Sequence, residues 1–161
     1  HATIALGAAL AGAKGPGRYQ LFLAEGEIEV EAEEKDGRWL STLRSLPTRN
    51  EAVPEPVVEE ALGLFRYARD DLDTSLPPRR VNAGAEHLFL PLNSRERLSA
   101  MSYDLETGRE FMRRHGLVTV AFVWRGADGV FHARNAFASG GVLEDPATGA
   151  AAGGKFRQNP P

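Results

Sequence analysis

The chain has 161 residues, of which 42% are hydrophobic and 25% are charged, a composition typical of a folded globular protein. Its 19 basic and 22 acidic residues leave a formal net charge of −3, which disfavours nucleic-acid binding as the main function. The sequence contains no cysteine, so it can form no disulfide, thiolate metal site or catalytic thiol. We expect a cytoplasmic protein, with which this composition is compatible.

Residues 2–13 are small or apolar and predict a helix without a polar face, which protein should surround rather than leave on a surface. The run is too short to cross a membrane, and we expect no membrane partner. Apolar residues then recur at every second position and predict strands over residues 18–23, 27–33 and 38–43. Four glutamates occupy one face of the middle strand, which is typical of a half-exposed antiparallel sheet.

Residues 46–56 contain three prolines and few large apolar residues, so we interpret them as a linker. We divide the chain into residues 1–50 and 51–161. The second part predicts helices over 56–62, 94–101 and 104–115, and strands within 81–92, 117–124 and 130–137. A last helix of small residues is predicted over 146–153, with Asp145 as its N-cap and Pro146 at its first position.

The two small-residue helices begin with the most suggestive side chains, at His1 and at Asp145. The start of a helix offers unpaired N–H groups and a partial positive charge, which together can hold a carboxylate or a developing oxyanion. Spacing alone also allows Asp145 to be only a helix cap and His1 to be a residue without a role. No His-x-His or HExxH spacing occurs, so we expect no metal site.

Two motifs resemble one known family. Residues 1–5 (HATIA) are similar to the end of a Gly-His-Ala-Thr motif, and residues 144–150 (EDPATGA) to a Glu-Asp-Pro-Ala-Thr-Gly-Ser signature. Both are found in the phenazine-biosynthesis PhzF-like isomerases, relatives of diaminopimelate epimerase. The resemblance implies an α+β fold of two similar domains, each a curved, mostly antiparallel sheet around a central helix. It places the active site in the cleft between the domains, and both domains would be incomplete in this chain.

The resemblance also implies a function, an isomerase or epimerase that moves protons on a small carboxylate-bearing metabolite without a metal or organic cofactor. It gives His1 and Asp145 the catalytic roles. Substrate binding would involve a set of flanking residues: Ala2, Thr3, Thr148, Gly149 and Ala150. The resemblance leaves room for a homodimer.

Three departures from the family pattern keep a second hypothesis open. The family's catalytic glutamate lies upstream of the histidine motif, outside this sequence, and Ala150 stands where the family commonly has serine. The family's Arg-x-Phe-x-Pro stretch is altered here, at residues 134–139. We therefore expect an internal portion of a longer protein, which is either an isomerase or a PhzF-like ligand-binding protein without catalysis.

Overall fold

The computed structural model describes residues 2–23, 26–44, 47–146 and 148–151. The chain divides into two compact units, residues 1–47 and residues 48–161. The dividing point lies slightly before the boundary that we predict after residue 50. Each unit has its own sheet, of three strands in the first unit and five in the second.

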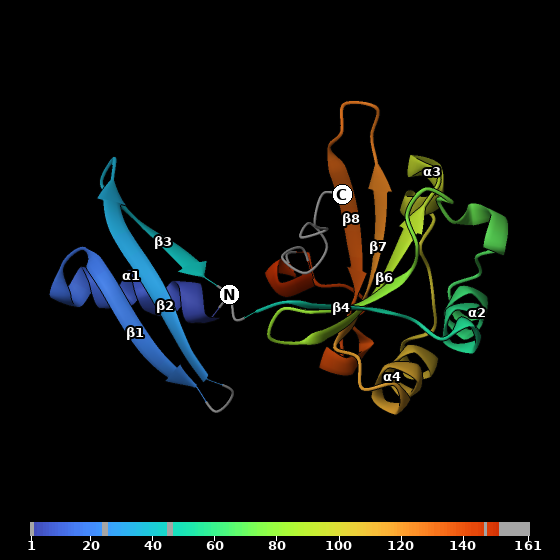
Figure 1. Ribbon diagram of the computed structural model, residues 1–161, viewed down its shortest axis with the longest axis horizontal. Coiled ribbons are helices and arrows are strands. Elements are labelled where there is room, and N and C mark those ends of the chain that lie inside the picture. Colours follow the sequence, from blue (N-terminus) through green and yellow to red (C-terminus); the bar gives the residue numbers. More distant parts are fainter. Residues whose placement is uncertain (1, 24–25, 45–46, 147, 152–161) are drawn as a thin grey trace. The chain divides into compact units, whose positions relative to one another are not determined.

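The first unit is one helix packed on a three-stranded antiparallel meander (Figure 1). Helix α1 (Ala2–Lys14) is followed by β1 (Gly17–Leu23), β2 (Gly26–Lys35) and β3 (Arg38–Arg44), with β2 in the middle. Along β2 the apolar residues Ile28, Val30 and Ala32 are buried, while the glutamates between them point away from the core. The predicted helix and all three predicted strands of this region are confirmed.

Small residues bring α1 close to the sheet. A side chain at Gly7 would collide with Val30 and Ser41, and Ala11 is fully buried. The opposite side of the helix is open, because Ile4 and Leu6 remain 44% and 47% exposed. The expectation that protein surrounds this helix is therefore not met by the described residues, which cover it on one side with a single small sheet.

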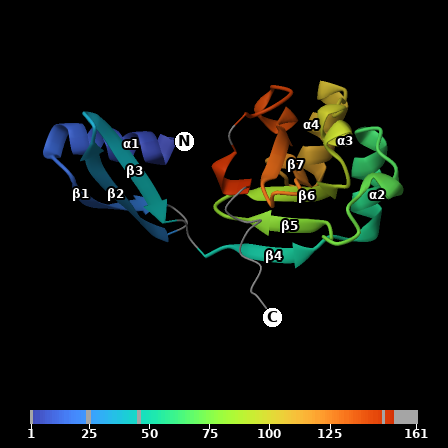
Figure 2. The same ribbon diagram turned by 90° about the horizontal axis from the view of Figure 1, so that it is seen from above.

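The second unit contains a five-stranded sheet in the order β4-β5-β6-β7-β8 (Figure 2). Its strands are β4 (Arg49–Ala52), β5 (Arg79–Asn82), β6 (Glu86–Leu92), β7 (Thr119–Arg125) and β8 (Phe131–Ala136). All neighbours are antiparallel except β6 and β7, which are parallel and joined through a helical crossover. Strand β4 lies inside the predicted linker, so the linker prediction is wrong at residues 49–52.

Three helices cover one face of this sheet: α2 (Glu55–Leu64), α3 (Arg95–Ser99) and α4 (Leu105–Arg114). Two short 3-10 turns, residues 69–71 and 138–140, complete the unit. Ser94 and Asp104 cap α3 and α4, accepting hydrogen bonds from the backbone N–H groups of Arg97 (3.2 Å) and Thr107 (2.9 Å). The main core lies between these helices and the sheet, and its largest fully buried side chains include Phe65, Phe111, Phe122, Leu62, Leu88 and Leu90.

The opposite face of the sheet has a smaller apolar cluster of Val81, Phe89 and Val123. All buried polar residues found in the described ranges, His87, Thr119 and Asn135, alternate along the strands with the residues of the main core. They therefore share this second face, where His87 Nδ1 lies 2.8 Å from Thr119 Oγ1. No helix within the described ranges combines the length and the apolar character needed to cross a membrane.

Candidate active site

The predicted site residues fall into two groups, one in each unit. His1 lies outside the described residues. Ala2 and Thr3 begin α1, with Thr3 half-buried. The remaining residues, Asp145, Thr148, Gly149 and Ala150, follow β8 in the second unit.

The second group forms a turn that leads into a helix. The described helical residues begin at Gly149. Pro146 lies in the turn, so the prediction that it occupies the first helical position is wrong. The rest of the predicted helix, residues 152–153, lies outside the described residues. Thr148 donates its hydroxyl to Asp145 Oδ2 at 2.6 Å, and both residues are half-buried. This hydrogen bond links the carboxylate to the residue just before the helix.

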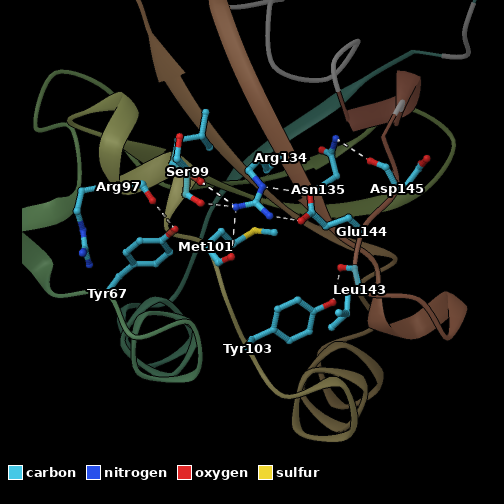
Figure 3. A network of polar contacts seen from close by, with 11 residues as sticks. Tyr67, Arg97, Ser99, Met101, Tyr103, Arg134, Asn135, Leu143, Glu144 and Asp145 are labelled. Atoms are coloured by element: carbon cyan, nitrogen blue, oxygen red, sulfur yellow. Dashed lines mark hydrogen bonds and ion pairs between the residues drawn. The ribbon is translucent and has the colours of Figure 1, made fainter.

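The backbone before the turn is attached to β8. The Asp145 N–H donates to the Asn135 carbonyl at 3.0 Å, and Asn135 Nδ2 donates to the Asp145 carbonyl at 3.4 Å. Ala136 and Glu144 form an antiparallel bridge beside this pair. The acidic residues of the motif are therefore paired with the sheet in an extended conformation before the chain turns (Figure 3).

Arg134 holds the side chain of Glu144. Its Nε donates to Glu144 Oε2 at 3.1 Å, and its Nη2 donates to Glu144 Oε1. Its remaining terminal nitrogen, Nη1, donates to three backbone carbonyls at the end of α3, those of Ser99 (2.8 Å), Met101 (3.2 Å) and Leu98 (3.3 Å). Figure 3 shows the guanidinium between these carbonyls and the carboxylate, so one side chain joins α3, β8 and the motif.

Tyr103 provides another attachment of the motif, to the backbone of the residue that precedes Glu144. Its hydroxyl donates to the Leu143 carbonyl at 2.6 Å, and its ring packs against Phe65 with a centroid separation of 4.7 Å. Burial raises the pKa of the Tyr103 phenol, and the nearby Glu144 carboxylate raises it further. The hydroxyl therefore keeps its proton and remains a hydrogen-bond donor at neutral pH.

The sequence identifies the motif but not the residues that hold it. Arg134 stands out only as part of the altered family stretch, and nothing near Tyr103 in the sequence indicates contact with residue 143. Strand alternation could have shown that Arg134 and Asn135 leave β8 on opposite faces. The contact of Arg134 with the end of α3 depends on the tertiary fold.

The Asp145 carboxylate is half-buried and accepts the Thr148 hydroxyl. Three side chains hold the segment that contains it, those of Tyr103, Arg134 and Asn135. Such a carboxylate can exchange a proton with a bound molecule. Within the described ranges, no cluster of three or more histidine, aspartate or glutamate side chains is placed to ligate a metal ion.

Comparison with known proteins gives a consistent family match. The profile of the phenazine biosynthesis-like protein family, PhzC-PhzF, matches residues 1–155. Among curated proteins, none matches the chain significantly.

Solved structures of similar fold align with nearly the whole chain. A PhzF-family phenazine biosynthesis protein of Bacillus anthracis shares 18% identity, with a TM-score of 0.75. A predicted epimerase of Pseudomonas aeruginosa shares 24% identity, with a TM-score of 0.74. Each alignment covers 96% of this chain and 54% of the relative, so the chain spans about half the length of these proteins. A PhzF-family protein of Enterococcus faecalis shares 17% identity at a TM-score of 0.54, over 94% of this chain and 52% of its own. The predicted α+β fold of the diaminopimelate epimerase type is thereby confirmed.

Proposed function

This chain belongs to the phenazine biosynthesis-like PhzC-PhzF family, and on that premise we propose that it forms part of a cofactor-independent isomerase or epimerase. Its substrate would be a small metabolite that carries a carboxylate. The family membership supports the class of reaction, and the epimerase named among the structural relatives agrees with it.

The observation that carries the proposal is the Asp145 carboxylate, which accepts the Thr148 hydroxyl while the Asp145 N–H is bonded to β8. An acid–base group needs a fixed direction, because proton transfer requires the donor and acceptor atoms to lie within hydrogen-bond distance. The cap Asp104 accepts the Thr107 hydroxyl in the same way, so the experiment below separates a cap from an acid–base group.

In the proposed reaction, a C–H bond next to the substrate carboxylate breaks and its proton passes to an acid–base side chain. A proton is then returned to the other face or to another carbon, so the substrate is rearranged without net oxidation. We assign these roles to Asp145 and His1. Thr148, Gly149 and Ala150, together with Ala2 and Thr3, would bind the substrate.

The substitution Asp145→Asn tests the role of the carboxylate. Asparagine caps helices and turns about as well as aspartate, so the melting temperature should change little. Proton exchange on the substrate should fall by about 10²-fold or more, the usual contribution of a positioned acid or base. Asp145→Ala would not separate the roles, since it removes the hydrogen-bond acceptor together with the acid.

A second candidate function is binding of the same class of ligand without catalysis. Ala150 favours it, because the family's usual serine hydroxyl is absent at this half-buried position. If Asp145→Asn leaves proton exchange undiminished while the variant is folded, Asp145 is structural. The second function is preferred if the parent protein binds such a ligand and exchanges no proton on it.

A further inference from the structure

We propose that Arg134 is a positioning residue of this site, which holds Glu144 and thereby fixes the direction of the Asp145 carboxylate. The inference rests on the proposed function, since a position matters for catalysis only if Asp145 transfers protons. Arg134 itself would touch neither the substrate nor the reacting atoms.

Groups from two separate segments of the chain depend on this one side chain. Arg134 donates to both oxygens of Glu144 and to three carbonyls at the end of α3. The rigid fork of a guanidinium can satisfy a carboxylate and a cluster of carbonyls at once, which the single ammonium of lysine cannot do. The side chains of Arg134 and Glu144 are 29% and 34% exposed, so water replaces these bonds only in part.

Holding Glu144 also holds Asp145, because Asp145 follows Glu144 directly in the chain. The backbone at this point is held by the bridge between Ala136 and Glu144 and by the bonds between Asn135 and Asp145. One of those bonds is long, at 3.4 Å, and therefore weak. Without Arg134, residues 144 and 145 would lose their strongest side-chain anchor, and the turn to Thr148 would open more often.

The loss of Arg134 also changes the charge balance of the motif. Removing Arg134 leaves the half-buried Glu144 carboxylate without its cation. This carboxylate then gains by turning toward water, because a desolvated anion without a partner is unfavourable. We expect the motif to leave its place beside β8, while the main core stays folded because α2, α4 and the strands still pack together there.

The sequence allows a direct test because it contains no cysteine. Ala151→Cys introduces one thiol at a described, fully buried position just after the turn. Its rate of alkylation by iodoacetamide under native conditions reports how often this segment opens. In this background, Arg134→Gln should raise the rate at least about tenfold, and Arg134→Lys should give an intermediate rate.

Arg97→Gln is the matched control. Arg97 also makes a half-buried ion pair, with Asp71 at 2.7 Å, and also donates to a backbone carbonyl, that of Arg66. It lies on α3 and does not contact the motif. Arg97→Gln should lower the melting temperature to a similar degree but should leave alkylation of Cys at position 151 within about twofold of the parent rate. Equal acceleration by both variants would overturn the inference.

A second readout connects the inference to catalysis. If Arg134 positions Asp145, Arg134→Gln should lower kcat for proton exchange by about tenfold or more and change KM little, and Arg134→Lys should recover part of the loss. Unchanged kcat with accelerated alkylation would also overturn it. If the unmodified protein exchanges no protons, the proposed function fails, whereas the alkylation comparison still shows whether Arg134 holds the motif.

Discussion

At the scale of single residues, Tyr67 shows how burial changes a titration. Its hydroxyl donates to the Arg97 carbonyl at 2.9 Å, and the residue is only 7% exposed. Burial raises the pKa of the Tyr67 phenol to about 12, although the cations of Arg97 and Arg134 act in the opposite direction. Tyr67 therefore stays protonated in the folded protein at a pH where an exposed tyrosine is already ionised.

This difference predicts a loss of stability at high pH. An unfolded tyrosine titrates near pH 10, so the proton is bound more tightly in the folded state. The contribution of the Tyr67 proton to the free energy of unfolding is complete below about pH 10 and is lost as the pH rises toward about 12. At pH 11 the free energy of unfolding is lower by about 1 kcal/mol.

Urea unfolding at pH 8 and pH 11 measures this loss of stability, with Tyr67→Phe as the comparison. The variant should be less stable at pH 8 by about 1 kcal/mol, because the Arg97 carbonyl loses its donor. Its further decrease between the two pH values should be smaller than that of the parent. Parallel decreases in the two proteins would contradict the raised pKa.

At the scale of elements, α4 approaches the motif through Gly108. A side chain at this position would collide with the ring of Tyr103 and lie 3.2 Å from Ala138 Cβ. The ring is held in place at its far end, where its hydroxyl binds the Leu143 carbonyl. The close packing of α4 therefore depends on a glycine, despite the cost of glycine inside a helix.

Gly108→Ala should accordingly destabilise the protein. Overpacking usually costs about 1–3 kcal/mol, which exceeds the gain of about 1 kcal/mol that alanine brings to a helix interior. Gly63→Ala is the matched control, because Gly63 lies in α2 with open space around its Cα. Thermal unfolding should show a lower melting temperature for Gly108→Ala and an equal or higher one for Gly63→Ala. A stabilised Gly108→Ala would show that Tyr103 moves without cost.

The elements predicted correctly are those with a strong local pattern. Residues 27–33 alternate between apolar and acidic side chains, and Ser94 and Asp104 have the chemistry of helix caps. The missed strand β4 has no such pattern, because its four residues are all exposed and only one of them is apolar.

Strand β4 is held instead by partners from other parts of the chain. It pairs with β5, and its Arg49 donates to Glu86 of β6 at 2.7 Å. Burial opposes ionisation of Glu86, but hydrogen bonds from Asn82 and Arg80 and the charges of Arg80 and Arg49 outweigh it and lower the pKa of the carboxyl. A sequence window around residue 50 contains none of these groups.

The residues of the candidate site were predictable from the local motif, whereas the residues that anchor it were not. The motif at residues 144–150 identifies Asp145 and Thr148, which the structure joins by a hydrogen bond. The helix begins later than predicted, because the Asp145 N–H pairs with β8 and Pro146 lies in a turn. The anchors Arg134 and Tyr103 come from elements whose packing no local pattern reveals.

At the scale of the whole molecule, each unit contributes one of the two segments that the family resemblance associates with catalysis. The first unit contains the helix with Ala2 and Thr3, and the second contains the turn with Asp145. The chain spans about half the length of the matched structures. We propose the isomerase activity on the basis of the family match over residues 1–155.

The most direct measurement of that activity is solvent deuterium incorporation. The protein, dialysed against a chelator and free of added cofactor, is incubated in D2O with a panel of small hydroxy and amino acids, and the products are followed by NMR and mass spectrometry. We predict deuterium at a carbon next to the carboxylate of at least one compound, and a loss of about 10²-fold or more in its rate with Asp145→Asn. Binding of one or more of these compounds, with no deuterium incorporated into any member of the panel, would contradict the isomerase and support a ligand-binding protein in its place.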